Sequence, residues 1–93
     1  MNGQRRSTMN VILDILRTIQ LSGNRAKPTH ILYKANLSHK LLKKYLAMLL
    51  TNGFIEDFTD GNRIYYRLTT KGQEFIVAYK KMEKLAIGFG LPI

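Results

Sequence analysis

Lysine side chains recur on one face of a predicted helix that begins after Ser38 and ends near residues 51–52. Leucines at 42, 46 and 49 form the opposite, apolar face. The polar face carries candidate contacts to phosphates or base edges: Ser38, His39, Lys40, Lys43 and Lys44. Ammonium groups bind phosphate oxygens as point charges, and short polar side chains reach base edges. The spacing predicts a helix for a major groove, although a plain amphipathic helix with solvated lysines has the same pattern.

Two aromatic-rich segments follow, residues 54–59 and 63–68, separated by the hairpin turn signal Asp60-Gly61-Asn62. Strict alternation predicts one set of side chains facing the core, Ile64, Tyr66 and Leu68, and another facing solvent or nucleic acid, Arg63, Tyr65 and Arg67. We expect Arg63, near the tip, to enter a minor groove and Arg67 to bind a phosphate. The acids Glu56, Asp57 and Asp60 oppose deep insertion, and mere covering of the sheet surface explains Tyr65 and Arg67 equally well.

Further basic residues lie outside these two segments. Residues 1–8 are predicted to form a mobile basic arm through Arg5 and Arg6. Arg25 and Lys27 lie in a loop between the first helix, expected over 9–21, and a short second helix that begins at Pro28. Arg5, Arg6, Arg25 and Lys27 can add non-specific phosphate contacts. For the arm, the alternative is a tail that only increases solubility.

The last predicted helix, residues 70–87, has apolar side chains spaced as in a heptad seam. The expected dimer contacts are Phe75, Ala78, Met82 and Leu85, with Phe89 four residues further on. The stripe is longer than a monomeric core of this size needs, which favours antiparallel pairing with a second copy. Folding back across the first helix is the alternative. The segment 88–93 is apolar and interrupted by glycine. Packing against the partner subunit is one option for it, and the sequence does not decide its role.

Composition limits the classes of function. The chain has 93 residues, enough for one domain, and a net charge of +9, which predicts a polyanionic partner. Residues 1–53 hold nine Lys and Arg against one acid, whereas residues 54–93 hold six against five. The anion-binding surface is therefore expected in the first half.

Other classes lack support in the sequence. There is no cysteine, no signal-peptide pattern and no long apolar run, so we expect a cytoplasmic, nucleoid-associated protein without a membrane partner. The two histidines, His30 and His39, have no companion ligands in a recognisable spacing. No catalytic residue, metal, cofactor or small-molecule ligand is predicted, and an enzyme is not expected.

The order helix, helix, helix, hairpin, helix predicts a mainly α fold with a small β-hairpin (α+β), the winged helix-turn-helix, over residues 9–69. The chain resembles small archaeal winged-helix DNA-binding proteins of the transcriptional-regulator and basic dimeric chromatin types. The resemblance rests on Leu37-Ser38, on residues 42–46 and 49–55, and on Tyr66-Arg67-Leu68-Thr69-Thr70-Lys71-Gly72 followed by Phe75. It implies double-stranded DNA binding and a homodimer joined through residues 70–87. An RNA-binding winged helix and a protein-interaction module that docks an acidic partner remain alternatives.

Overall fold

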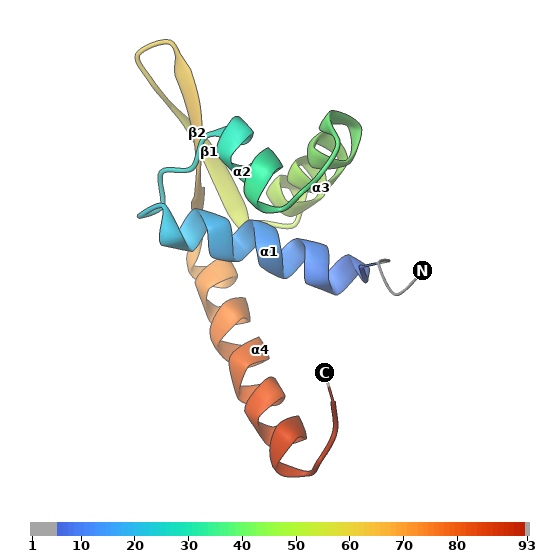
Figure 1. Cartoon of the computed structure of the whole chain (residues 1–93). Helices are drawn as coiled ribbons and strands as arrows, with labels where there is room; N and C mark the ends of the chain where they lie inside the picture. The colour runs from blue at the N-terminus through green and yellow to red at the C-terminus, as the bar shows by residue number, and fades with distance from the viewer. Residues whose placement is uncertain (1–5, 93) are drawn as a thin grey trace.

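The computed structural model describes residues 6–92, which form four helices and one antiparallel hairpin (Figure 1). The elements are α1 (Thr8–Leu21), α2 (Pro28–Lys34), α3 (His39–Thr51), β1 (Ile55–Asp60), β2 (Arg63–Leu68) and α4 (Thr70–Gly88). Figure 1 shows α2, α3 and the hairpin on one side of α1, while α4 leaves on the other side. The predicted order of elements and the winged helix-turn-helix architecture are confirmed.

Three of the four helices begin at a side-chain cap. The hydroxyl oxygens of Ser7, Ser38 and Thr69 each accept a hydrogen bond from the backbone N–H three residues later, at 3.0, 3.2 and 3.1 Å. Such caps satisfy backbone donors that a helix leaves unpaired. The remaining helix, α2, begins with Pro28, whose missing N–H costs nothing at a first helical position. The chain therefore specifies these boundaries locally.

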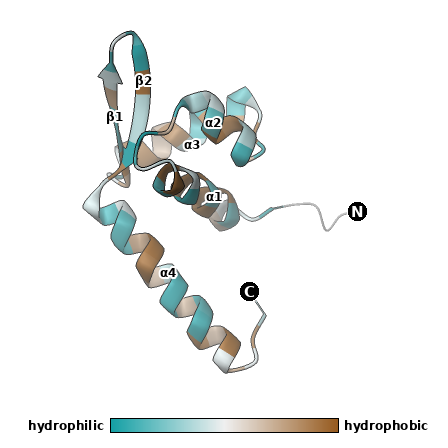
Figure 2. Cartoon of the chain, turned by 60° about the vertical axis from the view of Figure 1, so that its left-hand side comes forward, coloured by the Kyte–Doolittle hydropathy of each residue, from teal (hydrophilic) through white to brown (hydrophobic). Residues whose placement is uncertain are grey.

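The hydrophobic core is built around α1 and includes the base of the hairpin. Figure 2 shows the apolar centre of α1 surrounded by the other elements. Ile55 and Leu68 are partners in the strand register and are both buried, whereas the tip around Gly61 projects beyond the body. The buried apolar cluster consists of Val11, Ile15, Leu16, Ile19, Ala26, Ile31, Leu32, Ala35, Leu42, Leu46, Leu49, Ile55, Leu68 and Ile76. The hairpin is thus fixed at one end and free at the other.

The start of α4 is pressed against Phe54, the residue that directly precedes β1. A methyl group on Gly72 would overlap the backbone carbonyl oxygen of Phe54, so only glycine fits without a shift of the backbone. The same carbonyl accepts a hydrogen bond from the N–H of Thr69 at 3.1 Å. The rings of Phe54 and Phe75 meet edge to face, with centroids 5.5 Å apart. These contacts fix the point and direction at which α4 departs.

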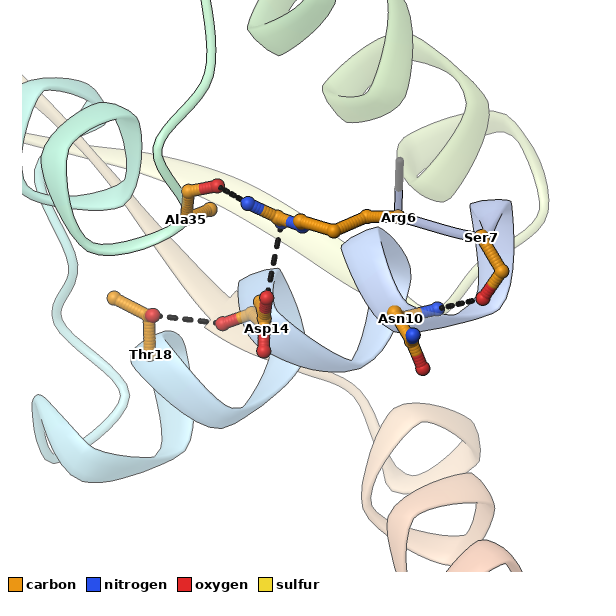
Figure 3. Close-up of polar contacts among 6 residues, drawn as sticks. All are labelled: Arg6, Ser7, Asn10, Asp14, Thr18 and Ala35. Carbon is orange, nitrogen blue, oxygen red and sulfur yellow. Dashed lines mark hydrogen bonds and ion pairs between the residues drawn. The ribbon is translucent and has the colours of Figure 1, made fainter. Parts of the chain in front are cut away.

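Arg6 differs from the prediction of a mobile arm over residues 1–8 (Figure 3). Its guanidinium donates a hydrogen bond to the carbonyl of Ala35 at 2.5 Å and pairs with the Asp14 carboxylate at 2.9 Å. The negative end of α2 and the single acid of residues 1–53 attract it together. Ser7 and Thr8 already cap and begin α1. Arg5 lies outside the described residues.

Candidate nucleic-acid interface

The exposed face of α3 carries the lysines that the sequence predicted. Leu42, Leu46 and Leu49 are buried in the core, which turns the polar face outward. All five predicted contacts on this helix are exposed: Ser38, His39, Lys40, Lys43 and Lys44. Within the part of the chain that the structure describes, none of the three lysines forms an ion pair. Their positive charge is therefore open to an anionic ligand.

A groove joins the start of α2 to the tip of the wing. It has a volume of about 280 Å³ and is lined by Lys27, Pro28, Thr29, Asn62, Arg63 and Ile64. Lys27, predicted to contact phosphates, and Arg63, predicted to enter a minor groove, thus lie on one groove although 36 positions separate them in the sequence. Neither residue has an ion-pair partner among residues 6–92.

The sequence did not predict Thr29, Asn62 or Ile64 as lining residues of this groove. Ile64 was expected to face the core, and that prediction is wrong because its side chain is 47% exposed. The hairpin tip extends past the body, so an inward-facing side chain there has little to pack against. Alternation predicts which face of the sheet a side chain lies on. It does not predict whether other elements of the fold cover that face at that position.

The outer face of the wing, formed by Glu56, Phe58, Asp60, Arg63, Tyr65 and Arg67, contains its own counter-charges. Arg67 pairs through Nε with a Glu56 carboxylate oxygen at 2.7 Å. Arg25 reaches over from the loop before α2 and pairs through Nη2 with Asp60 at 2.5 Å. Two predicted phosphate contacts, Arg25 and Arg67, therefore already hold carboxylates.

The same arginines stack on aromatic rings. The guanidinium of Arg25 lies 4.2 Å from the ring centroid of Tyr65, and that of Arg67 lies 4.8 Å from the ring centroid of Phe58. The two rings are themselves stacked, with centroids 5.6 Å apart. Tyr65, expected to face solvent, is only 7% exposed because Arg25 and Phe58 cover it. Cation–π contact and stacking together keep both guanidinium groups in place.

Two pKa shifts reflect these settings. The hydrogen bond to Asp60 raises the pKa of Arg25, so this guanidinium stays charged under all ordinary conditions. Burial raises the pKa of the Tyr66 hydroxyl, and the negative charge of Asp57 adds to that shift. Tyr66 packs against the core from the inner face of the wing, as the alternation predicted. Its ring is thus part of the support of the wing.

The residues predicted for dimerisation divide into two groups. Phe75 packs against Phe54 within the same chain. Ala78 is exposed, as are Met82 at 45% and Leu85 at 63%. The helix diverges from α1 beyond an ion pair of Arg17 with Glu83 at 3.5 Å, so it does not fold back across α1. Among residues 6–92, the apolar stripe formed by Ala78, Met82 and Leu85 on α4 therefore stands without a partner.

Two further absences belong to the described part of the chain. Among residues 6–92, no three side chains of His, Cys, Asp or Glu gather as a possible metal site. The same span contains no helix with the length and hydropathy needed to cross a membrane.

With this geometry established, comparison with known proteins identifies the family. A family model described as winged helix-turn-helix matches residues 5–87. This chain belongs to that family. The winged helix chain is also similar to two uncharacterized proteins of Methanocaldococcus jannaschii, MJ0290 (33% identity over 81 residues) and MJ0287 (37% over 70 residues). It covers 36% and 66% of their lengths, while the matches span 87% and 75% of this chain.

Solved structures show the same winged helix fold. Sso10a-2, a DNA-binding protein from Sulfolobus solfataricus, has 26% sequence identity and a TM-score of 0.75, with 90% of this chain and 85% of that chain covered. ZitR of Lactococcus lactis, solved in complex with DNA, has 13% identity and a TM-score of 0.53, with 89% and 64% covered. At that identity the second likeness concerns the fold alone.

Proposed function

We propose that this winged helix protein binds double-stranded DNA and acts as a transcriptional regulator or a nucleoid-associated protein. The N-terminal part of α3 enters the major groove and the wing tip contacts the flanking backbone. The observation that carries the proposal is the exposed face of α3, where Lys40, Lys43 and Lys44 have no ion pair among the described residues. The groove of Lys27 and Arg63 extends this cationic surface toward the wing.

The structural neighbours support this partner. Sso10a-2 is described as a DNA-binding protein, and its likeness covers nine tenths of this chain. The charge distribution agrees, because the surface lysines lie in the half of the sequence with nine cations and one acid. A duplex-DNA partner places the protein in the cytoplasm, with the nucleoid.

Binding is expected to depend mainly on phosphates. Lysine is a flexible point charge, whereas bidentate recognition of a base edge is typical of Arg, Asn and Gln. The exposed face of α3 carries three lysines and none of these bidentate side chains before Asn52. We therefore expect modest sequence discrimination and a strong dependence on salt.

The protein is proposed to act as a homodimer through α4. Met82 and Leu85 expose apolar surface that the described part of the chain does not cover, and Figure 2 shows apolar stretches recurring along this helix. Large apolar patches on small proteins mark interaction surfaces. A dimer presents two α3 helices, so their separation sets the spacing of the two contacted DNA segments.

Fluorescence anisotropy of a labelled random-sequence duplex, titrated with protein at several salt concentrations, tests the proposal. If a dimer neutralises about eight phosphates, the slope of log K against log salt is about −7. Tight binding with that slope favours a nucleoid role. Weak binding to random duplex together with tight binding to selected genomic fragments favours a regulator of specific operators.

A pair of charge-reversed variants locates the surface. Lys43→Glu with Lys44→Glu is expected to abolish binding at moderate salt, because both changes place carboxylates in the major groove. Lys80→Glu with Lys81→Glu is the matched control, since both residues are exposed on α4 and the change in net charge is identical. Equal binding by the two variants would show that α3 is not the contact surface. Tighter binding to structured RNA in direct competition would favour an RNA partner, and no salt-sensitive binding at all would favour an acidic protein.

A further inference from the structure

An apolar groove lies where α1 and α3 meet the start of α4. It has a volume of about 180 Å³ and is lined by Met9, Ile12, Met48, Leu49, Asn52, Phe54 and Phe75. None of these side chains is charged, although the chain carries 15 Lys and Arg. Met9 on its rim is exposed. A neutral, apolar ligand is what such a lining can receive.

The chain has an apolar segment of matching character just after α4. Phe89 is 76% exposed and Leu91 is 59% exposed. The turn that presents them is well defined, because Gly90 has a φ of +80° and the N–H of Leu91 donates to the carbonyl of Ala86 at 2.8 Å. Residues 88–93 contain no charged side chain. The tail is therefore an ordered apolar projection up to Pro92, the last described residue.

The described part of the tail lies far from the groove of its own copy. Phe75 and Phe89 lie on one helix and its cap, 14 residues apart, which corresponds to about 21 Å along the axis. The described residues after Phe89, up to Pro92, span at most about 11 Å when extended. Within one copy, Phe89 and Leu91 therefore do not reach the groove beside Phe75.

We infer that the tail of one copy, through Phe89 and Leu91, docks in this groove of a second copy. The inference rests on the proposed homodimer and adds a contact to its antiparallel pairing. Met82 lies midway between Phe75 and Phe89, seven residues from each. When two α4 helices run antiparallel about Met82, Phe89 of one copy lies level with Phe75 of the other. Phe75 already lines the groove, so the exposed stripe and the groove form one continuous apolar surface.

Charge favours the same direction. A parallel pair would place two strongly basic winged domains side by side, and like charges in close proximity repel. An antiparallel pair separates those domains to opposite ends of the paired helices. The tails then lie beside the partner's α1 and α3, where the lining of the groove carries no charge.

A double-mutant cycle on the dimer dissociation constant tests the docking, with sedimentation equilibrium as the measurement. Phe89→Ala is expected to raise the dissociation constant at least about tenfold, equal to about 1.4 kcal/mol. Met48→Ala, in the groove, is expected to do the same. Figure 1 shows α3 and the end of α4 at opposite ends of the molecule, so coupling between the two changes must act across copies. The double variant should be little weaker than either single variant.

Val77→Ala is the control, because Val77 is exposed on α4 but lies off the stripe; its effect should stay within about twofold. Asn52→Lys, an exposed groove residue, replaces Met48→Ala in the cycle if that variant loses helical circular dichroism. Additive effects of the tail and groove changes would overturn the docking while leaving helix pairing intact. A monomer at all concentrations would overturn both the docking and the homodimer, whereas DNA binding is measured separately by anisotropy.

Discussion

The exposed face of α3 and the outer face of the wing carry the same kind of charge in different settings. The lysines of α3 form no ion pair among residues 6–92, and residues 37–55 contain no Asp or Glu. The wing places Glu56 against Arg67 and Asp60 against Arg25. A count of Lys and Arg along the sequence does not distinguish the exposed face of α3 from the outer face of the wing. The structure distinguishes charges that are open to a ligand from charges that are already paired.

This difference concerns availability more than stability. Exposed ion pairs contribute only about 0–1 kcal/mol, so the wing gains little in folding energy from its two pairs. A phosphate that approaches Arg25, however, must compete with Asp60 at 2.5 Å. A phosphate that approaches Lys43 meets no such competitor. The comparison therefore predicts that α3 contributes most of the DNA affinity.

The largest expected effect comes from removing the α3 charges. Replacing Lys40, Lys43 and Lys44 by Ala takes six cations from a dimer, which should make the salt slope shallower by about 5. Anisotropy titrations at several salt concentrations measure the slope. Lys80, Lys81 and Lys84 of α4, replaced together by Ala, are the matched control. If the salt slope becomes shallower by the same amount in both variants, the lysines of α3 contribute no more to DNA binding than those of α4.

A smaller effect separates two arginines of one strand. Arg63→Ala and Arg67→Ala change the net charge equally and alter the same face of β2. Only Arg63 lacks an ion pair within the described residues. Its loss should reduce the slope by about 2 per dimer, whereas the loss of Arg67 should leave DNA binding within experimental scatter. The opposite ranking would mean that Arg67 exchanges Glu56 for phosphate.

Removing a carboxylate from the wing should leave Arg25 unpaired, as the lysines of α3 are within the described residues. Asp60→Asn removes the carboxylate that holds Arg25 and should tighten DNA binding, with a slope steeper by up to about 2 per dimer. Glu74→Gln, an exposed change of equal charge on α4, controls for the general gain in positive charge. If both variants bind DNA equally well, Asp60 does not compete with phosphate for Arg25.

The smallest effect is on folding. Arg67→Ala loses an ion pair and a contact with the Phe58 ring, so the free energy of unfolding should fall by about 1 kcal/mol. Lys43→Ala should change it by less than about 0.5 kcal/mol. Urea denaturation followed by circular dichroism resolves the two. Equal losses would indicate that the lysines of α3 also have structural partners.

Local features of the sequence predicted the fold well. Helix starts at Ser7, Ser38 and Thr69 depend on hydrogen bonds within three residues, so a short stretch of sequence contains the required information. The burial of Leu42 and Leu46 follows from the helical period in the same way. The family resemblance and these patterns agree, which explains why the order of elements was correct.

The predictions that were wrong depend on distant residues. Tyr65 is buried because Arg25, 40 positions earlier, lies over its ring. Arg6 is bound because the carbonyl of Ala35 lies at the end of a different helix. Ile64 is exposed because the tip of the hairpin extends beyond the helices that would otherwise cover it. Each outcome depends on the tertiary packing of elements, which periodicity within one element does not reveal.

The close approach of Gly72 to the Phe54 carbonyl has a consequence for the proposed dimer on DNA. It sets the angle at which α4 leaves the winged domain. In the proposed dimer this angle determines how far apart, and at what rotation about the double helix, the two α3 helices lie. A side chain at this position would change the angle, so the protein could retain every residue proposed to contact DNA and still be unable to engage both segments of one duplex together.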